Sequence, residues 1–247
     1  MTGQSDLPPL RQLCLGTVPY RDAWRLQRVI AAQRVSGEVE DDVLILLEHP
    51  PVYTMGRTGD ERHLGGGRES LIAAGADYID VDRGGSVTFH GPGQLVAYPI
   101  VKLASVFPIQ GAPDRGDVMR YVRALEEAVI ATAAAFGVAV ARRPPYSGVW
   151  SGNRKLAAIG VKLATGMTTH GLALNVCTDL SWFDRVVPCG IDGAEVTSLT
   201  DLSSVELCTE DVAPVLAAEL ARVLGRRLAA PRRDSRYELP LELPAAV

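Results

Sequence analysis

The strongest structural constraint in the sequence is a pair of apolar runs joined by a turn. The segment from Lys155 to Val176 reads KLAAIGVKLATGMTTHGLALNV. Its Thr165-Gly166 pair is typical of a two-residue hairpin turn, because glycine readily adopts a positive φ. The register that follows from this turn pairs Ala164 with Met167, Gly160 with Gly171, and Ala158 with Ala173.

This register predicts a hairpin face without bulky side chains. Side chains alternate along a strand and opposed residues share a face, so Ala158, Gly160, Gly171 and Ala173 fall together. Such a face suits either a closely packed helix or a slim apolar ligand such as a fatty acyl chain, and the pattern favours neither. A register slip of one residue would scatter the four residues.

The rest of the chain mixes helical and strand-like patterns without a regular alternation. Apolar spacing predicts helices over 20–35, 68–74 and 118–136, and a further helix with Thr209 as its N-cap. Strand-like runs cover 43–47, 78–81, 86–101 and 138–142. We therefore expect a single α+β domain over residues 1–230, with flanking helices around a mixed or largely antiparallel sheet, and a tail over 231–247.

Charge and composition argue against several classes of protein. The net charge is −4 with a pI near 5.6, which disfavours a global electrostatic attraction to nucleic acid or to an anionic membrane. No apolar run approaches the roughly 20 residues of a membrane helix. The N-terminus lacks the pattern of an export signal, so we expect a cytoplasmic protein. The four cysteines form no CxxC pair and no zinc-like cluster, which predicts reduced thiols and no metal site.

A glycine-rich stretch, DRGGSVTFHGPGQLVAYP over residues 82–99, has two interpretations. It is either a bulged strand with a hairpin turn, or a strand that faces a ligand. In the second case Arg83 and exposed amides would hold a polar head group, and His90 would handle a proton or a hydrogen bond. His49 precedes Pro50-Pro51 at a strand end, where a structural hydrogen-bonding role is more common.

Cys189 lies between a proline and a glycine in RVVPCGID. A thiol becomes reactive when a cation or amide dipoles favour its thiolate. Lys155, Lys162, His90 and His170 are candidate partners, and Lys155 at a strand end is preferred. From local composition alone, a buried turn thiol is the more common outcome. The other cysteines (Cys14, Cys177 and Cys208) have apolar or threonine neighbours and are interpreted as core residues.

Several segments, taken in order, resemble one family. RGGSVTFHGPGQLVAYP, GVW…RKLAAIGVKL, THGLALNV and VPCGI…VTSL, which lie between Val43 and Leu199, are similar to the lipoyl(octanoyl) transferases. This family shares the fold of lipoate and biotin protein ligases. The resemblance implies an acyltransferase that takes an octanoyl group from octanoyl-acyl carrier protein as a cysteine thioester. It then passes the group to a lysine of a lipoyl domain, the first step of endogenous protein lipoylation.

The resemblance also implies partners and cofactors. The acceptors would be lipoyl domains of 2-oxo acid dehydrogenase E2 subunits and the glycine cleavage H protein. The donor would be linked to its carrier through phosphopantetheine, and neither ATP nor a metal would be needed. Two rival functions are an ATP-dependent lipoate ligase of the same fold and a catalytically silent module that binds acyl carriers.

Residue roles carry over at the matching motifs. Cys189 corresponds to the nucleophile and Lys155 to the lysine that activates it, while His49 and His170 are possible accessory residues. The implied substrate-binding residues are Arg83, Gly84, Gly85, Ser86, Val87, Thr88, Phe89, His90, Ala158, Ile159, Gly160, Gly171, Leu172 and Ala173. Phe89 replaces a frequent tyrosine and Ala158 a frequent serine, and neither change removes a catalytic group of the family.

Overall fold

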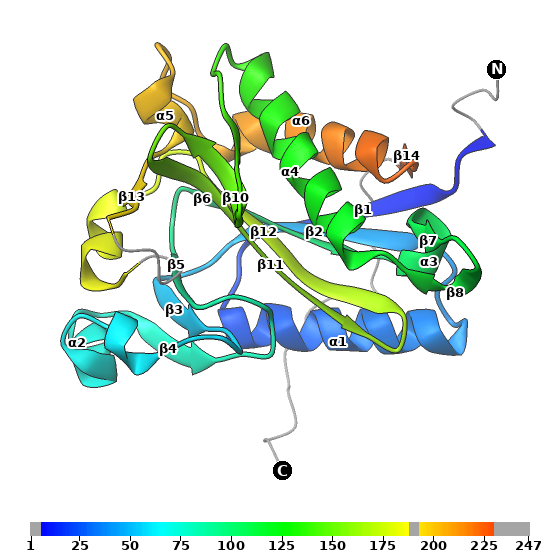
Figure 1. Ribbon diagram of the computed structural model, residues 1–247, viewed down its shortest axis with the longest axis horizontal. Helices are drawn as coiled ribbons and strands as arrows, with labels where there is room; N and C mark the ends of the chain where they lie inside the picture. Colours follow the sequence, from blue (N-terminus) through cyan, green and yellow to red (C-terminus); the bar gives the residue numbers. More distant parts are fainter. Residues whose placement is uncertain (1–5, 188–192, 230–247) are drawn as a thin grey trace.

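The computed structural model describes residues 6–187 and 193–229. Within these residues the largest element is a nine-stranded mixed sheet (Figure 1). Its strands are β1 (Pro9–Thr17), β2 (Asp42–Glu48), β6 (Gln94–Ile100), β9 (Ala141–Arg143), β10 (Tyr146–Ser151), β11 (Arg154–Ala164), β12 (Met167–Asn175), β13 (Glu195–Val196) and β14 (Arg227–Leu228). The order is β14-β1-β2-β6-β12-β11-β10-β9, and β13 pairs with β11. The pairs from β2 to β9 along this order are antiparallel.

A smaller sheet lies beside the large one and carries part of the glycine-rich stretch. It orders β4 (Asp77–Asp80), β3 (Val52–Met55) and β5 (Val87–His90). Next to it are α2 (Gly67–Ala73) and the 3-10 turns η2 (Glu61–His63) and η3 (Leu180–Arg185). A separate ribbon pairs β7 (Pro108–Ile109) with β8 (Ala112–Gly116).

Helices cover both faces of the large sheet (Figure 1). The helices α4 (Val118–Ala135) and α6 (Thr209–Val223) pack on one face, α1 (Tyr20–Ser36) packs on the other, and α3 (Leu103–Val106) and α5 (Leu199–Leu202) are short. The strand β2 shows the layering, because Leu44 and Leu46 contact the α4/α6 side while Val43, Ile45 and Leu47 contact the α1 side. A strand buried on both faces reads as a continuous apolar run, as 43–47 does.

The expected α+β fold with a largely antiparallel sheet and flanking helices is confirmed, as are the helices near 20–35, 68–74 and 118–136. The sequence patterns missed β1, and only the end of the run 138–142 enters β9. The N-cap of α6 is Cys208 instead of Thr209, and its N–H donates to the Asp211 carboxylate at 2.9 Å. No helix in the described ranges is long and apolar enough to cross a membrane. The tail over 231–247 lies outside the described residues.

The prediction that Cys14, Cys177 and Cys208 are core residues is wrong, since all three are exposed. Cys177 follows β12 and Cys208 caps α6, so both lie where a regular element ends. Cys14 lies within β1, next to a register irregularity. Apolar sequence neighbours indicated burial, but these positions reach the surface.

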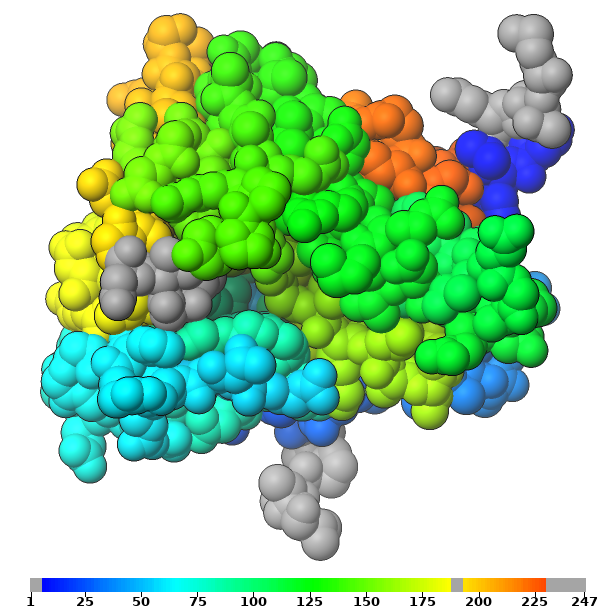
Figure 2. Space-filling view, in the orientation of Figure 1, coloured from blue at the N-terminus to red at the C-terminus, as the bar shows by residue number. Residues whose placement is uncertain are grey.

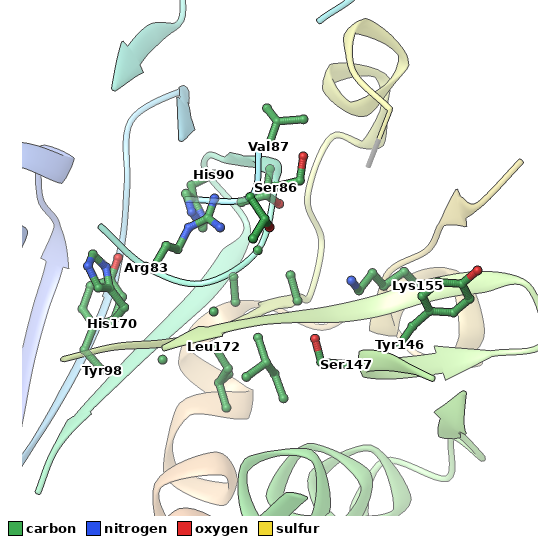
Figure 3. A pocket seen from close by; sticks show the side chains of 18 of the residues that line it. Arg83, Ser86, Val87, His90, Tyr98, Tyr146, Ser147, Lys155, His170 and Leu172 are labelled. Carbon is green, nitrogen blue, oxygen red and sulfur yellow. The ribbon is translucent and has the colours of Figure 1, made fainter. Parts of the chain in front are cut away.

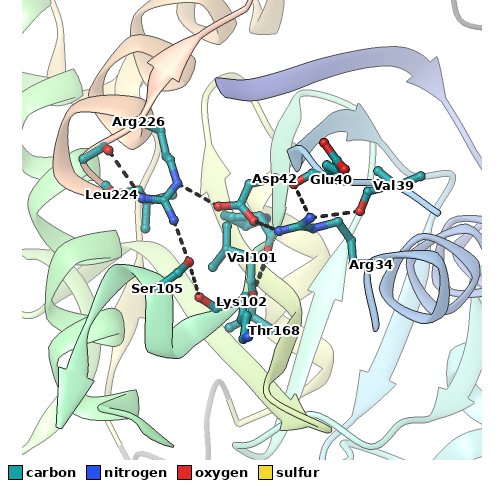
Figure 4. A network of polar contacts seen from close by, with 12 residues as sticks. Arg34, Val39, Glu40, Asp42, Val101, Lys102, Ser105, Thr168, Leu224 and Arg226 are labelled. Atoms are coloured by element: carbon teal, nitrogen blue, oxygen red, sulfur yellow. Dashed lines mark hydrogen bonds and ion pairs between the residues drawn. The ribbon is translucent and has the colours of Figure 1, made fainter. Parts of the chain in front are cut away.

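A buried carboxylate at the start of β2 connects several elements near the β14 edge of the large sheet (Figure 4). The side chain of Asp42, only 3% exposed, accepts from Arg34 Nη2 at 2.7 Å and from Arg226 Nε at 2.7 Å. Arg226 also donates to Ser105 Oγ at 2.8 Å. The cluster therefore ties α1, β2, α3 and the segment before β14 together.

We expect Asp42→Ala to destabilise the fold by about 3–5 kcal/mol, because it leaves two largely buried guanidinium groups without their carboxylate. The exposed pair Arg21–Asp77, with 3.7 Å between Nε and Oδ2, provides the matched control. Asp77→Ala should cost less than about 1 kcal/mol. Urea unfolding measures both values, and equal losses in the two variants would contradict this account.

Candidate active site

The hairpin of β11 and β12 forms one wall of a pocket. Its register is the predicted one, with Ala164 opposite Met167, Gly160 opposite Gly171, and Ala158 opposite Ala173. A cavity of about 160 Å³ lies against these strands and the segment around Arg83–His90. This is close to the roughly 150 Å³ of an engineered apolar cavity that binds benzene. In Figure 2 a hollow separates the part coloured cyan to teal from the green part.

The pocket brings together most of the predicted binding residues. Within the segment from Arg83 to His90, all but Gly84 and Phe89 line it, as do 158–160 and 171–173. Gly84 instead donates its N–H to Val161 O at 3.0 Å. Phe89 points to the other side of β5, where its ring stacks on Trp182 with 5.2 Å between centroids. Their substrate-binding roles, like those of the lining residues, stay predictions.

The two glycines of the hairpin face serve packing as well as the pocket. A Cβ on Gly160 would lie 2.9 Å from Arg83 Cδ, and one on Gly171 would collide with the carbonyl oxygen of Ala97 in β6. Both positions therefore need glycine because protein atoms approach them closely. The small-residue face is thus partly a close-packing surface and partly an open slot.

Arg83 lies over this face and is held by backbone and hydroxyl oxygens. Its Nη2 donates to Thr54 O at 2.7 Å and to Thr54 Oγ1 at 2.8 Å, and its Nη1 donates to Gly84 O at 3.0 Å. The side chain is buried. These contacts fix the loop before β5 against β3, so that the loop covers the hairpin.

A β-bulge directs Lys155 into the pocket. Trp150 pairs with Lys155 and Val149 with Ala157, so Leu156 is an extra residue in β11. Without it, alternation would place Lys155 and Ala158 on opposite faces. Lys155 lines the pocket, is 6% exposed, and holds its Nζ 5.1 Å from the centroid of the Trp150 ring. By contrast, Lys162 ion-pairs with Asp82.

Gly148 in β10 leaves room for the Lys155 side chain, which packs closely against it. Gly148 has φ +111, and a Cβ there would lie 2.7 Å from Lys155 Cε and 2.6 Å from the carbonyl oxygen of Ala157. The buried Glu126 carboxylate accepts the Gly148 N–H at 3.0 Å. Arg123 and Arg142 ion-pair with the same carboxylate. The α4 helix thereby fixes the strand on which the lysine rests.

Three buried histidines, His49, His90 and His170, lie in the pocket wall or directly behind it. His49 donates from Nδ1 to Val18 O at 2.6 Å and accepts from the Tyr98 hydroxyl at Nε2, at 2.8 Å. Burial lowers its pKa to about 4. Burial also lowers the pKa of His90 and of His170, so the imidazoles are neutral at neutral pH. His170 and His90 line the pocket, whereas His49 lies behind Tyr98.

Cys189 lies outside the described residues, and its role stays a prediction. The described residues on either side are held by hydrogen bonds. Val187 N–H donates to His63 O at 2.8 Å, and Asn153 Nδ2 donates to Gly193 O at 2.6 Å. A few residues further on, Val196 in β13 pairs directly with Lys155.

Sequence patterns missed several residues that line the pocket: Tyr20, Thr58, Tyr98, Tyr146 and Ser147. Tyr20 and Tyr98 were assigned only to a helix and a strand. Their convergence depends on how α1 and β6 pack, for which the sequence carries no local signal. Among the described residues no group of three or more His, Cys, Asp or Glu side chains could hold a metal ion.

Comparison with known proteins gives a consistent result. The model of the lipoyl protein ligase A/B catalytic domain matches residues 19–221. A protein of Rubrobacter xylanophilus named octanoyltransferase is 48% identical over 212 residues, which cover 85% of this chain and 91% of that protein. One of Thermobifida fusca with the same name is 47% identical, covering 84% and 85%.

Solved structures support the fold. Lipoate-protein ligase A bound with ATP aligns with a TM-score of 0.72 at 16% identity, covering 92% of this chain and 90% of that one. The putative lipoate protein ligase Ta0514 of T. acidophilum with bound lipoic acid aligns with a TM-score of 0.69 at 17% identity, with the same coverage. At these identities the likeness concerns the fold alone.

The neutral histidines predict a loss of stability in acid. His49 has a folded-state pKa of about 4, below its ordinary value of 6.5, so the unfolded chain binds more protons between these values. The stabilisation that comes from keeping His49 neutral is complete above pH 6.5 and is lost as pH falls toward 4. The free energy of unfolding therefore changes by up to about 1.4 kcal/mol per pH unit in this range.

Urea unfolding at several pH values in this range measures the slope. His49→Gln should lower the free energy of unfolding at neutral pH. It should also make that free energy less dependent on pH, because the titrating group is gone. Tyr98→Phe removes the hydroxyl that contacts His49 but keeps the imidazole, so its dependence should stay steep. An unchanged slope in His49→Gln would exclude this origin.

Proposed function

The chain belongs to the family of the lipoyl protein ligase A/B catalytic domain, and we propose that it is an octanoyltransferase which acylates the lysine of lipoyl domains. The observation that carries the proposal is the close relationship to proteins named octanoyltransferase over most of the chain. The pocket supports it, because a narrow slot floored by small residues and ending at a buried lysine suits an acyl chain with a reactive carbonyl.

Lys155 supplies the cation that a reactive thiol needs. We propose that Cys189 is the nucleophile and that the Lys155 ammonium favours its thiolate. The pairing of β13 with Lys155 supports this role, since the chain leads from Cys189 to that strand within a few residues. The Lys155 Nζ also lies 5.1 Å from the centroid of the Trp150 ring, at cation–π distance.

The proposed reaction has two half-reactions. In the first, the Cys189 sulfur bonds to the octanoyl carbonyl carbon, and the bond to the carrier's phosphopantetheine sulfur breaks. The thiol proton passes to the departing sulfur. In the second, the acceptor amine bonds to the same carbon, the enzyme thioester breaks, and one amine proton restores the thiol. Lys155 is suited to relay both protons.

Thioester exchange leaves bond energies nearly unchanged, so the proposed reaction needs neither ATP nor a metal. The proposed donor is octanoyl-acyl carrier protein. The proposed acceptors are the lipoyl domains of E2 subunits and the glycine cleavage H protein. The cytoplasm is the expected place of reaction. A lipoate ligase that uses ATP is the alternative, and the shared fold does not distinguish the two.

Intact-mass measurement after mixing with octanoyl-acyl carrier protein, without ATP, tests the proposal. We expect a covalent octanoyl adduct that disappears when an apo-lipoyl domain is added. The adduct should be absent in Cys189→Ser and retained in Cys177→Ser, which removes an exposed thiol outside the pocket lining. Transfer only with ATP would indicate the ligase. Tight carrier binding without an adduct would indicate a silent module.

The close approach of Lys155 to Gly148 predicts that a larger residue at position 148 lowers kcat. Gly148→Ala should displace the lysine and lower kcat by about 100-fold, the usual scale for a misplacement of about 1 Å, with a smaller change in KM. The control is Gly152→Ala in the adjoining turn. Gly152 also has a positive φ, +60, but a Cβ there would contact nothing within 4 Å.

Gly152→Ala should therefore lose stability through backbone strain and keep most of its kcat. The pH profile of kcat should shift in Gly148→Ala and not in Gly152→Ala, because only the former moves the lysine. Equal kcat losses with unshifted profiles would show that Gly148 has only a structural role.

A further inference from the structure

The turn between β10 and β11 carries Asn153, an exposed residue whose side chain joins two segments that are distant in the sequence. Its Oδ1 accepts from Arg143 Nη1 at 2.7 Å, and its Nδ2 donates to Gly193 O at 2.6 Å. A guanidinium only donates and a carbonyl oxygen only accepts, so the group between them must do both, as an amide does. A carboxylate at this position could accept from Arg143 but could not donate to Gly193.

Arg143 is held by two aromatic rings at the Lys155 end of the pocket. Its Cζ lies 5.6 Å from the centroid of the Tyr146 ring and 5.1 Å from that of the Trp150 ring. Tyr146 lines the pocket, and Figure 3 shows it toward the same end as Lys155. The Lys155 Nζ contacts the same indole at 5.1 Å. The Trp150 ring therefore lies at cation–π distance from both Arg143 and Lys155.

These contacts form one continuous path from Lys155 to the chain that follows Cys189. The path runs through Lys155, Trp150, Arg143, Asn153 and Gly193. Gly193 is the first described residue after Cys189 and follows it by four positions, which span at most about 14 Å. Among the described residues, the next hydrogen bond along this chain is from Glu195 N–H to Asn153 O, at a longer 3.4 Å. The Asn153 side chain therefore holds the described residue that follows Cys189 most closely.

We propose that Asn153 is a positioning residue that fixes the chain after Cys189 relative to Lys155. Arg143 orients the Asn153 amide for this contact. The inference rests on the proposed function and adds two residues to the proposed pair of thiol and lysine. Neither residue lines the pocket, so both act through the residues that they contact. Thioester formation needs the sulfur near the lysine, whereas binding of the acyl chain does not. Loss of the Asn153 contact should therefore lower kcat and leave KM nearly unchanged.

The single-turnover rate of octanoyl-adduct formation, followed by intact mass with octanoyl-acyl carrier protein, tests this inference. Asn153→Ala should lower this rate and kcat by about 10- to 100-fold, the scale of a misplacement of about 1 Å. Asn153→Asp keeps the acceptor for Arg143 but loses the donor to Gly193, so it should be as slow as Asn153→Ala. Arg143→Ala should also be slow. Combining it with Asn153→Ala should add little to the larger single loss, because both changes act on one contact.

Arg154→Ala is the matched control, because it removes an exposed cation next to Asn153 and outside the pocket lining. Its adduct rate and kcat should equal those of the wild-type protein. Asn153 is exposed, so the urea midpoints of its variants should also stay near the wild-type value. A wild-type adduct rate in Asn153→Asp, or an equal loss in Arg154→Ala, overturns the inference alone. Additive losses in the double variant overturn the role of Arg143. No adduct on the wild-type protein overturns the proposed function as well.

Discussion

The pairing of β11 with β12 is the constraint on which the pocket depends. The pair lies in the interior of the large sheet, with β6 on one side and β10 and β13 on the other. Ala158 and Ala173 are opposed in it, and one step along the strands Gly160 faces Gly171. A shift of one residue would turn large side chains into the slot. Because β11 and β12 are each paired on both sides, the neighbouring strands help to hold their register.

Two backbone irregularities in this sheet direct Lys155 and His170 into the pocket. The bulge at Leu156 turns Lys155 to the slot, and Gly148 leaves room for its side chain. At the far end, the left-handed backbone of His170 places an imidazole where an ordinary strand residue would continue the pleat. Sheets hold register strongly, so a local departure can re-aim one side chain without disturbing its neighbours.

The two ends of the pocket differ in electrostatic character. The buried side chain of Lys155 lies beside the Trp150 indole at one end. At the other end, burial raises the pKa of Tyr20 to about 12 and lowers the pKa of His170, so the pair bonds without net charge.

The hairpin, its register and the main helices could be predicted from the sequence. They depend on neighbouring residues, on strand alternation, and on a turn that glycine tolerates easily. The bulge at Leu156 that turns Lys155 toward the pocket could not be predicted, because alternation alone places Lys155 and Ala158 on opposite faces. Tertiary structure decided what no local pattern contains: the exposure of Cys14, Cys177 and Cys208, the turn of Phe89 away from the pocket, and the meeting of Tyr20 with His170. Alternation tells which residues share a face, but only packing between distant elements decides what that face meets.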